Sequence, residues 1–229
     1  MKREISQAFT RILITCMSLS ILLIGTFVSA FAQTVGTSKE LDGRVEKFLN
    51  ENRRHWHDWN VPYKDGQTLF NLIVKNNYTR ALEIGTSTGH SAIWMAWALS
   101  KTGGKLITIE IDEDRYKTAL NNFKKAGVGE FIDARLADAH QLVKELKGPF
   151  DFVFSDADKE WYTQYFKEVD PKLVVGGCFT AHNVTDGFGD VTRFLNYIRS
   201  LSNYETTIDR SSSSGVSISY KKANSSSSR

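Results

Sequence analysis

The sequence is poor in cysteine, proline and net charge, and each of these shortages excludes a class of protein. Two cysteines among 229 residues cannot build a disulfide framework. Three prolines and 16 glycines are too few for a collagen-like or low-complexity chain. The formal net charge is only +3, and no basic stripe is interleaved with aromatic residues, so we expect no nucleic-acid partner. The remaining composition, 41% hydrophobic and 24% charged, is that of a globular protein with one domain of roughly 200 residues.

One long uncharged run, residues 12–32, follows a basic start and ends in the small-residue triplet Ala-Phe-Ala. This order is typical of a cleaved secretory signal. The run is also long enough to cross a bilayer at about 1.5 Å per residue, so an uncleaved anchor remains open. We therefore predict that residues 1–32 are a signal peptide or membrane anchor and that the protein is exported, periplasmic or secreted, or membrane-anchored. The folded domain is expected at 33–222, with a disordered tail at 223–229.

Short apolar runs and longer stretches of helical period alternate along the rest of the chain. Strands are predicted at 81–85, 105–111, 131–136, 150–155, 172–180, 204–210 and 215–220. Helices are predicted at 38–53, 65–77, 89–100, 113–126, 138–147, 158–170 and 187–202, with Asp65 as the N-cap of the second. A helix between successive members of the first five strands predicts an α/β fold with a parallel sheet covered on both faces. The short link between the last two strands predicts an antiparallel hairpin at the sheet edge.

The first predicted strand ends in a glycine turn, LEIGTSTGHS. Gly85 and Gly89 allow a ligand to approach the backbone closely, and the free N–H groups at the start of the next helix favour a polar or anionic group. The second strand ends at Glu110, whose carboxylate can accept hydrogen bonds from both hydroxyls of a ribose. The spacing of the two features predicts a nucleoside-containing ligand. Glu83, inside the first strand, suits a cationic amino-acid group better than a pyrophosphate.

Polar residues also follow the fourth and fifth predicted strands: Asp156, Asp158 and Lys159 in SDADKEWY, and His182 and Asn183 in AHNV. The carboxyl ends of parallel strands meet at one edge, so both segments should face one pocket. A carboxylate, an imidazole and an amide oxygen could hold a divalent cation, which would lower the pKa of a bound hydroxyl. Without a metal, His182 could itself be the general base. Both mechanisms remain open.

In their order, these motifs resemble the class I S-adenosylmethionine-dependent methyltransferases. The resemblance is strongest to the cation-dependent O-methyltransferases, the group that contains catechol and caffeoyl-CoA O-methyltransferases. It runs from about Trp59 to Tyr220 and rests on NVPYKDGQ, LEIGTSTGHS, ITIEID, SDADKEWY and GGCFTAHNV. It implies a Rossmann-like fold with a mostly parallel seven-stranded sheet and a C-terminal antiparallel hairpin. It also implies methyl transfer from S-adenosyl-L-methionine to a hydroxyl of a small-molecule acceptor, catechol-like or phenolic.

The resemblance further implies a role for each site residue. The cofactor contacts would be Val61, Glu83, Gly85 and Ser91 at the methionine part, Glu110 at the ribose, Ala139 and His140 near the adenine, and Asp158 and Tyr165. The metal ligands would be Asp156, His182 and Asn183, and Lys159 would be the base. The family usually has an aspartate where this chain has His182. That departure weakens the case for magnesium and leaves manganese, iron or zinc possible.

Several expectations concern partners and rival functions. Trp59, Trp161 and Tyr162 are the nearest aromatic candidates for an acceptor wall, whereas Trp94 and Trp97 are expected in the core. A homodimer is a further expectation from the resemblance, and an uncleaved run at residues 12–32 would attach the chain to a membrane. The rival classes are a non-catalytic nucleoside-binding module and a methyltransferase of a protein or another non-phenolic substrate. Export also conflicts with the cytoplasmic location of the cofactor.

Overall fold

A computed structural model describes most of the chain: residues 38–56, 59–185, 187 and 189–224. The predicted signal or anchor lies outside the described residues, as does most of the predicted tail. In the part of the chain that is described, no helix is both long enough and apolar enough to cross a bilayer.

The chain divides into two compact units, Met1–Gly43 and Arg44–Arg229. The described residues of the first unit, 38–43, are helical. Residues 44–51, at the start of the second unit, are helical as well. The predicted boundary at residue 33 stays a prediction.

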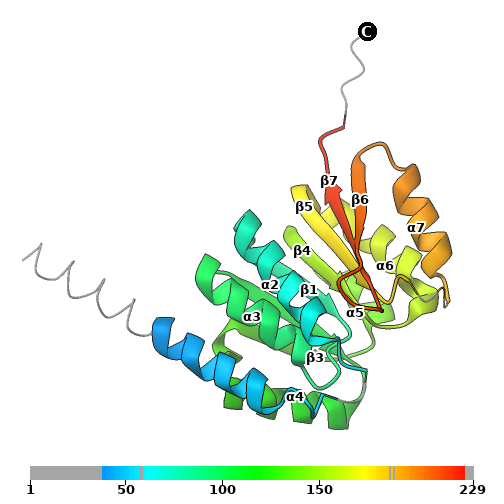
Figure 1. Cartoon of the computed structure of the whole chain (residues 1–229). Helices are drawn as coiled ribbons and strands as arrows, with labels where there is room; N and C mark the ends of the chain where they lie inside the picture. Colours follow the sequence, from blue (N-terminus) through cyan, green and yellow to red (C-terminus); the bar gives the residue numbers. More distant parts are fainter. Residues whose placement is uncertain (1–37, 57–58, 186, 188, 225–229) are drawn as a thin grey trace, which may run out of the picture. The chain divides into compact units, whose positions relative to one another are not determined.

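A seven-stranded sheet is the centre of the second unit (Figure 1). Its strands are β1 (Arg80–Ile84), β2 (Lys105–Glu110), β3 (Ile132–Leu136), β4 (Phe150–Ser155), β5 (Leu173–His182), β6 (Tyr204–Asp209) and β7 (Val216–Lys221). Their order across the sheet is β3-β2-β1-β4-β5-β7-β6. The strands β1 to β5 pair in parallel, and β7 pairs antiparallel with both β5 and β6. The predicted mostly parallel sheet with its C-terminal hairpin is thus confirmed.

Helices cover both faces of this sheet, as expected from the crossovers between parallel strands. They are α2 (Tyr63–Asn76), α3 (His90–Thr102), α4 (Glu113–Ala126), α5 (Ala139–Glu145), α6 (Tyr162–Val169) and α7 (Val191–Ser200). Short 3-10 turns are η1 (Gly129–Phe131), η2 (Lys159–Trp161) and η3 (Asp170–Lys172). Helices α2, α3 and α4 lie on one face, and α5, α6 and α7 lie on the other (Figure 1).

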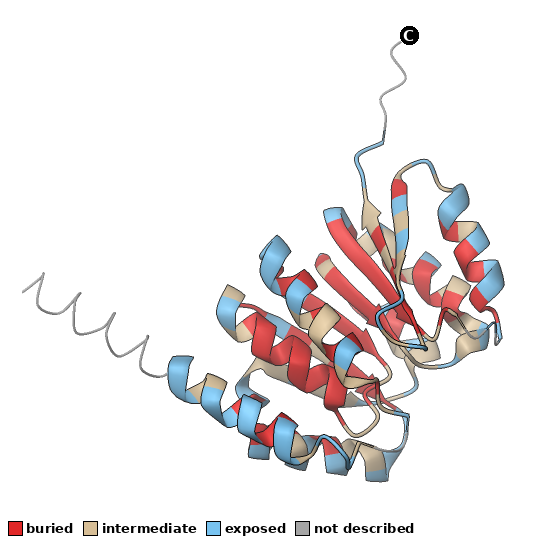
Figure 2. Ribbon diagram, in the orientation of Figure 1, coloured by how far each residue is buried: buried red, intermediate tan, exposed pale blue. Residues whose placement is uncertain are grey.

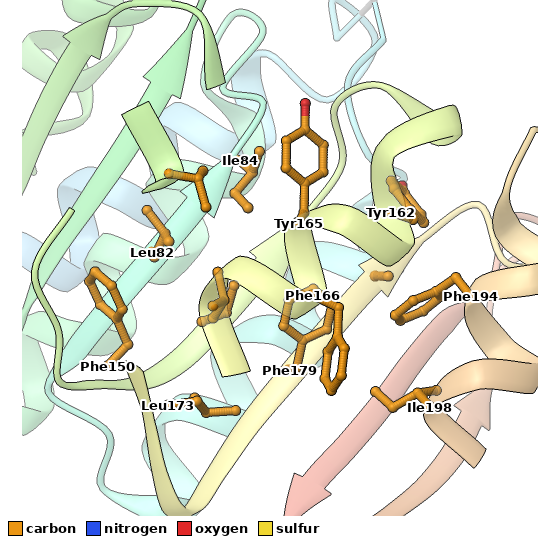
Figure 3. Close-up of a cluster of buried hydrophobic side chains, with 14 of the residues drawn as sticks. Leu82, Ile84, Phe150, Tyr162, Tyr165, Phe166, Leu173, Phe179, Phe194 and Ile198 are labelled. Atoms are coloured by element: carbon orange, nitrogen blue, oxygen red, sulfur yellow. The ribbon is translucent and has the colours of Figure 1, made fainter. Parts of the chain in front are cut away.

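The core on the α6 face is built from aromatic and aliphatic side chains of β4, β5, α6 and α7 (Figure 3). Leu82 and Ile84 of β1 point into this core. Glu83, between them, points to the opposite face, where it bonds to α3. On that face α3 is buried over nearly its whole length (Figure 2). The predicted core positions Trp94 and Trp97 are 4% and 8% exposed and are confirmed.

Three local predictions were wrong in detail. Helix α2 begins at Tyr63 after Pro62, so Asp65 is not its N-cap but lies buried in its first turn. The predicted helix 158–170 is divided into η2, α6 and η3. Strand β5 extends to His182, beyond the predicted end at residue 180, because its pairing with β7 continues to Val216.

Candidate active site

A cavity of about 570 Å³ lies at the carboxyl ends of the four central strands. Ten of the predicted site residues line it: Gly85, Glu110, Ala139, His140, Asp156, Asp158, Lys159, Tyr165, His182 and Asn183. The strands run in the order β2-β1-β4-β5. At a spacing of about 4.8 Å, the ends of β2 and β5 are roughly 14 Å apart. The lining residues thus extend from the end of β2 to the end of β5.

Glu110 ends β2 with its carboxylate fixed by three backbone N–H groups. Oε2 accepts from Ser87 N at 2.7 Å, and Oε1 accepts from Ile111 N at 3.0 Å and Asp112 N at 2.9 Å. The side chain is only 7% exposed, yet it lines the cavity. Each carboxylate oxygen can accept more than one hydrogen bond. Glu110 is thus held in place by three bonds, and Oε2, which accepts only one of them, keeps a free acceptor site for a ligand hydroxyl.

The glycine turn brings the backbone of β1 close to that of β4. Gly85 has φ +99°, and a Cβ there would lie 2.8 Å from Asp156 O. Gly89 has φ +97°, and a Cβ there would lie 2.5 Å from the Phe123 ring. Gly85 lines the cavity and Gly89 does not. Both glycines are therefore required by the packing of the chain, and Gly85 in addition leaves space for a ligand.

Glu83 lies beneath the turn, fully buried and away from the cavity lining. Its Oε1 accepts from Ser91 Oγ at 2.5 Å, and its Oε2 accepts from Thr108 Oγ1 at 2.5 Å. Burial raises the pKa of Glu83 from 4.5 to about 8, although both hydroxyl bonds oppose the shift. The two predicted cofactor residues Glu83 and Ser91 thus contact each other below the cavity floor.

The wall beyond β2 is formed by the start of α5 and by α6. His140 stacks on Trp161, with ring centroids 3.9 Å apart, and its Nε2 lies 3.3 Å from Asp158 Oδ2. Tyr165 of α6 is 5.8 Å from His140 between ring centroids. The aromatic rings of His140 and Tyr165 line the cavity here, which suits a planar ring beside Ala139.

The opposite end of the cavity carries a chain of four charged groups, here called the Asp65–Lys159 network. Lys159 Nζ donates to Asp156 Oδ1 at 2.6 Å. His182 Nδ1 lies 3.1 Å from Asp156 Oδ2, and His182 Nε2 lies 2.8 Å from Asp65 Oδ2. Ser212 Oγ, from the β6–β7 loop, donates to the same Asp65 oxygen at 2.8 Å.

The pKa values in this network follow from the pairing. Burial alone would lower the pKa of His182, but Asp156 and then Asp65 outweigh it and raise that pKa to about 9. Burial would raise the pKa of Asp156, but the positive charges of His182 and Lys159 lower it below its usual value. We infer that His182 is an imidazolium at neutral pH, with both ring nitrogens donating. In that state it has no lone pair with which to act as a general base.

The family follows from a comparison with known proteins. A model of the O-methyltransferase family matches residues 35–199, more than half of the chain. The chain belongs to the O-methyltransferase family. This confirms the resemblance to the class I S-adenosylmethionine-dependent O-methyltransferases.

Individual curated relatives match only part of the length of this chain. Flavonoid 3',5'-methyltransferase of Vitis vinifera is 35% identical over 149 residues, which cover 62% of this chain and 63% of that protein. Catechol O-methyltransferase of Niastella koreensis is 47% identical over 90 residues, 38% of this chain and 40% of that protein. The chain thus spans less than two thirds of the length of these curated relatives.

A solved structure matches more of the O-methyltransferase fold. The O-methyltransferase from Bacillus cereus, in complex with SAH (S-adenosylhomocysteine), gives a TM-score of 0.68 at 25% identity. The match covers 79% of this chain and 91% of that one. The class I methyltransferase fold is therefore shared over most of the neighbour's length.

The ligand set predicted for a metal in this O-methyltransferase does not fit a divalent cation as it is arranged. Both ring nitrogens of His182 face carboxylates, whereas each oxygen of Asp156 accepts one hydrogen bond and keeps a lone pair. A ligating imidazole needs one free lone pair. In the described part of the chain, no three His, Cys, Asp or Glu side chains are grouped so as to hold a metal.

Some predicted residues of the O-methyltransferase lie outside the cavity lining. Val61 is 3% exposed, and its backbone oxygen lies 2.9 Å from His90 Nδ1, while its neighbours Asn60 and Pro62 line the cavity. Tyr162, a predicted aromatic wall, is instead fully buried and donates to His182 O at 3.0 Å. Trp161 stacks on His140 outside the lining, whereas Trp59 lines the cavity and is 82% exposed.

Two functional positions could not be recognised from sequence patterns. Asp65 was read only as a helix cap, although it pairs with His182 across 117 positions of the chain. The sequence pattern does not single out His90, yet its ring joins α3 to the segment before α2 through Val61 O. Burial lowers the pKa of His90 to about 4, so His90 is neutral and accepts from Trp94 Nε1 at 3.1 Å.

Proposed function

We propose that this chain transfers the methyl group of S-adenosyl-L-methionine to a hydroxyl of a small catechol-like or phenolic acceptor. One observation carries the proposal: a cavity in which a fixed carboxylate, Glu110, and a lysine, Lys159, line opposite ends. Family membership and the SAH-bound structural neighbour support the choice of cofactor. The named catechol and flavonoid relatives support the choice of acceptor.

The nucleoside half of the cofactor is assigned to the β2 end of the cavity. One ribose hydroxyl would donate to Oε2 of Glu110, which accepts only from Ser87 N, and the other would share Oε1 with two backbone N–H groups. The adenine would lie beside Ala139 and the aromatic wall of His140 and Tyr165. The sulfonium and methionine parts would then extend past Gly85 towards β4.

The acceptor half is assigned to the β4 and β5 end, where Lys159, His182 and Asn183 line the cavity. In the reaction, the acceptor oxygen forms a bond to the methyl carbon while the carbon–sulfur bond breaks and S-adenosylhomocysteine leaves. Lys159, whose side chain is 26% exposed, first releases a proton to solvent; its amine then receives the hydroxyl proton, and Asp156, 2.6 Å away, stabilises the ammonium group that forms. The sulfonium methyl is already activated, so the protein mainly aligns the oxygen and accepts a proton.

The first experiment is calorimetric binding of S-adenosylhomocysteine to the purified protein, followed by a methyl-transfer assay over a panel of catechols and phenols. Micromolar binding and methylation of at least one acceptor are expected. Absence of binding would contradict the proposal. Binding without turnover over the whole panel would instead indicate a nucleoside-binding module, and transfer to proteins alone would indicate a protein methyltransferase.

We also propose that residues 1–32 export or anchor the protein, as their basic and apolar order predicts. Amino-terminal sequencing of protein from fractionated cells tests this directly. A mature start at Gln33 in an exported fraction supports cleavage, and an intact Met1 in a membrane fraction supports an anchor. An intact Met1 in the cytosol would contradict both.

A further inference from the structure

Asp65 is an acidic residue of α2 that is almost completely buried. It is 1% exposed, and its Oδ2 accepts from both His182 Nε2 and Ser212 Oγ at 2.8 Å. These partners come from β5 and from the β6–β7 loop, so Asp65 joins three segments that are far apart in the sequence. A buried carboxylate is costly unless it is paired and hydrogen-bonded, and here the pairing is with an imidazole that lines the cavity.

The network that contains Asp65 is electrically balanced without any added ion. Two carboxylates, Asp65 and Asp156, alternate with two cationic groups, His182 and Lys159. Every bond in this chain joins opposite charges, over 2.6, 2.8 and 3.1 Å. A divalent cation placed among them would find no free lone pair on His182, whose two ring nitrogens face carboxylates, and would add two positive charges to a balanced cluster.

The position of the imidazole adds a second argument. The His182 ring lies between two acids, Asp156 at 3.1 Å and Asp65 at 2.8 Å. A carboxylate accepts hydrogen bonds and does not donate them, so both ring nitrogens donate. One cationic side chain therefore already lies against Asp156 at the edge of the acceptor half of the cavity.

We propose that the His182 imidazolium, held between Asp156 and Asp65, takes the place of a divalent cation beside Asp156, so that this chain works without a metal. Asp65 acts through His182 and is a positioning residue. Lys159 is cationic in the resting network and receives the acceptor proton only after it has released its own proton to solvent, to which its side chain is 26% exposed. This inference deepens the proposed function, because it concerns how the same site handles the acceptor hydroxyl.

The decisive experiment measures metal binding and does not depend on turnover. Wild-type protein freed of metal with EDTA is titrated with MnCl₂ and with MgCl₂ by calorimetry, and its thermal unfolding is recorded with each salt. We expect no binding stronger than about 1 mM and a midpoint that moves by less than about 1 °C. Binding of either ion more tightly than about 0.1 mM would overturn the proposal.

A matched variant replaces the imidazolium by a carboxylate in the same site. In the double variant Asp65→Asn/His182→Asp, the imidazolium is removed and a carboxylate is placed beside Asp156 and Asn183, without leaving Asp65 as an unpaired buried charge. We expect this protein to bind Mn²⁺ below about 0.1 mM and to gain at least about 3 °C of midpoint on its addition. A folded double variant with no metal response would overturn the claim that His182 replaces a cation.

Turnover with catechol separates a positioning role for Asp65 from a purely structural one. Asp65→Asn should lower kcat about tenfold while KM for S-adenosylmethionine stays within about twofold, and Asp65→Glu should recover part of kcat. Asp209→Asn is the control, because Asp209 also bonds to α2, through Thr68 Oγ1 at 2.7 Å, but does not line the cavity. Equal kcat in Asp65→Asn and wild type would contradict the role of Asp65. Failure to bind S-adenosylhomocysteine would defeat the proposed function, while the metal titrations would still decide this inference.

Discussion

Replacing Glu110 by glutamine tests the assignment of the nucleoside site with a change of one atom. The side chain keeps its length and shape, and only the charge and one acceptor oxygen are lost. In the wild-type protein that carboxylate accepts three backbone N–H groups and, in the proposed complex, two ribose hydroxyls. The two sets of bonds predict effects on two different measurements.

The effect on affinity comes from the ribose. A hydrogen bond to a charged acceptor contributes about 1 kcal/mol more than one to a neutral acceptor, so two such bonds amount to about 2 kcal/mol. At 1.4 kcal/mol per factor of ten, the Kd for S-adenosylhomocysteine should rise about 30-fold. The product is chosen as the ligand because it carries no sulfonium charge, which reduces long-range electrostatic contributions.

The effect on stability comes from the backbone. A glutamine can turn its oxygen either to Ser87 N or to Ile111 N and Asp112 N, and its NH₂ group then faces the remaining donor. An unsatisfied buried N–H costs about 1 to 3 kcal/mol, in the free protein as well as in the complex. Urea unfolding should therefore show a loss of that size in Glu110→Gln, separately from the change in Kd.

The control is Asp112→Asn. Asp112 lies two residues away, outside the cavity lining, and caps α4 by accepting from Asp114 N and Arg115 N. Asparagine caps a helix about as well as aspartate, so this variant removes one negative charge with little change in stability. Its Kd should stay within about twofold of wild type. A folded Glu110→Gln protein with a Kd change below about threefold, or an equal loss in Asp112→Asn, would refute the ribose assignment.

Three further predictions concern Glu83, Gly85 and Lys159. Glu83 should be protonated in the folded protein up to about pH 8 but ionised above pH 4.5 in the unfolded chain. The unfolding free energy should therefore fall by up to about 5 kcal/mol as the pH rises from 4.5 to about 8. The variant Glu83→Gln should lack this part of the fall. Parallel curves of unfolding free energy against pH for the two proteins would contradict the raised pKa of Glu83. Gly85→Ala should lower the free energy of unfolding in urea by about 2 to 4 kcal/mol, because at a positive φ the new Cβ would approach Asp156 O. The control Gly129→Ala, with open space around its Cβ, should lower it far less. Equal losses in the two variants would refute the close approach at Gly85. Lys159→Gln should lower kcat with catechol by about 100-fold or more and leave the Kd for S-adenosylhomocysteine nearly unchanged, and a kcat within fivefold of wild type would exclude its role as base.

The strands and the ligand-binding end of the sheet could be predicted because their signals are local. The apolar runs that became β1 to β5 are bounded by turn residues and separated by helical periodicity, and the rules for parallel crossovers then fix the topology. Glu110 and Asp156 could be placed at the same edge for the same reason. A strand end is a position in the sequence, so residues found there can be located without knowledge of distant contacts.

The role of Asp65 could not be predicted because its partner is 117 positions away. An acidic residue near the start of a helix is usually interpreted as a cap or as a favourable charge at the helix N-terminus. Nothing in the local sequence distinguishes that case from a buried ion pair with a histidine of β5. The same limit applies to Tyr162, whose neighbours suggested a cavity wall although its ring lies fully inside the core.

The most direct test of the central claim is a crystal structure of the protein soaked with S-adenosylhomocysteine at a concentration that saturates it in calorimetry. The account predicts density for the ligand along the carboxyl ends of β2, β1 and β4. Both ribose hydroxyls should lie within about 2.6 to 3.2 Å of the Glu110 carboxylate oxygens, and the sulfur should point towards Lys159. A ligand bound elsewhere on the chain, or a cavity filled only by solvent under those conditions, would contradict it.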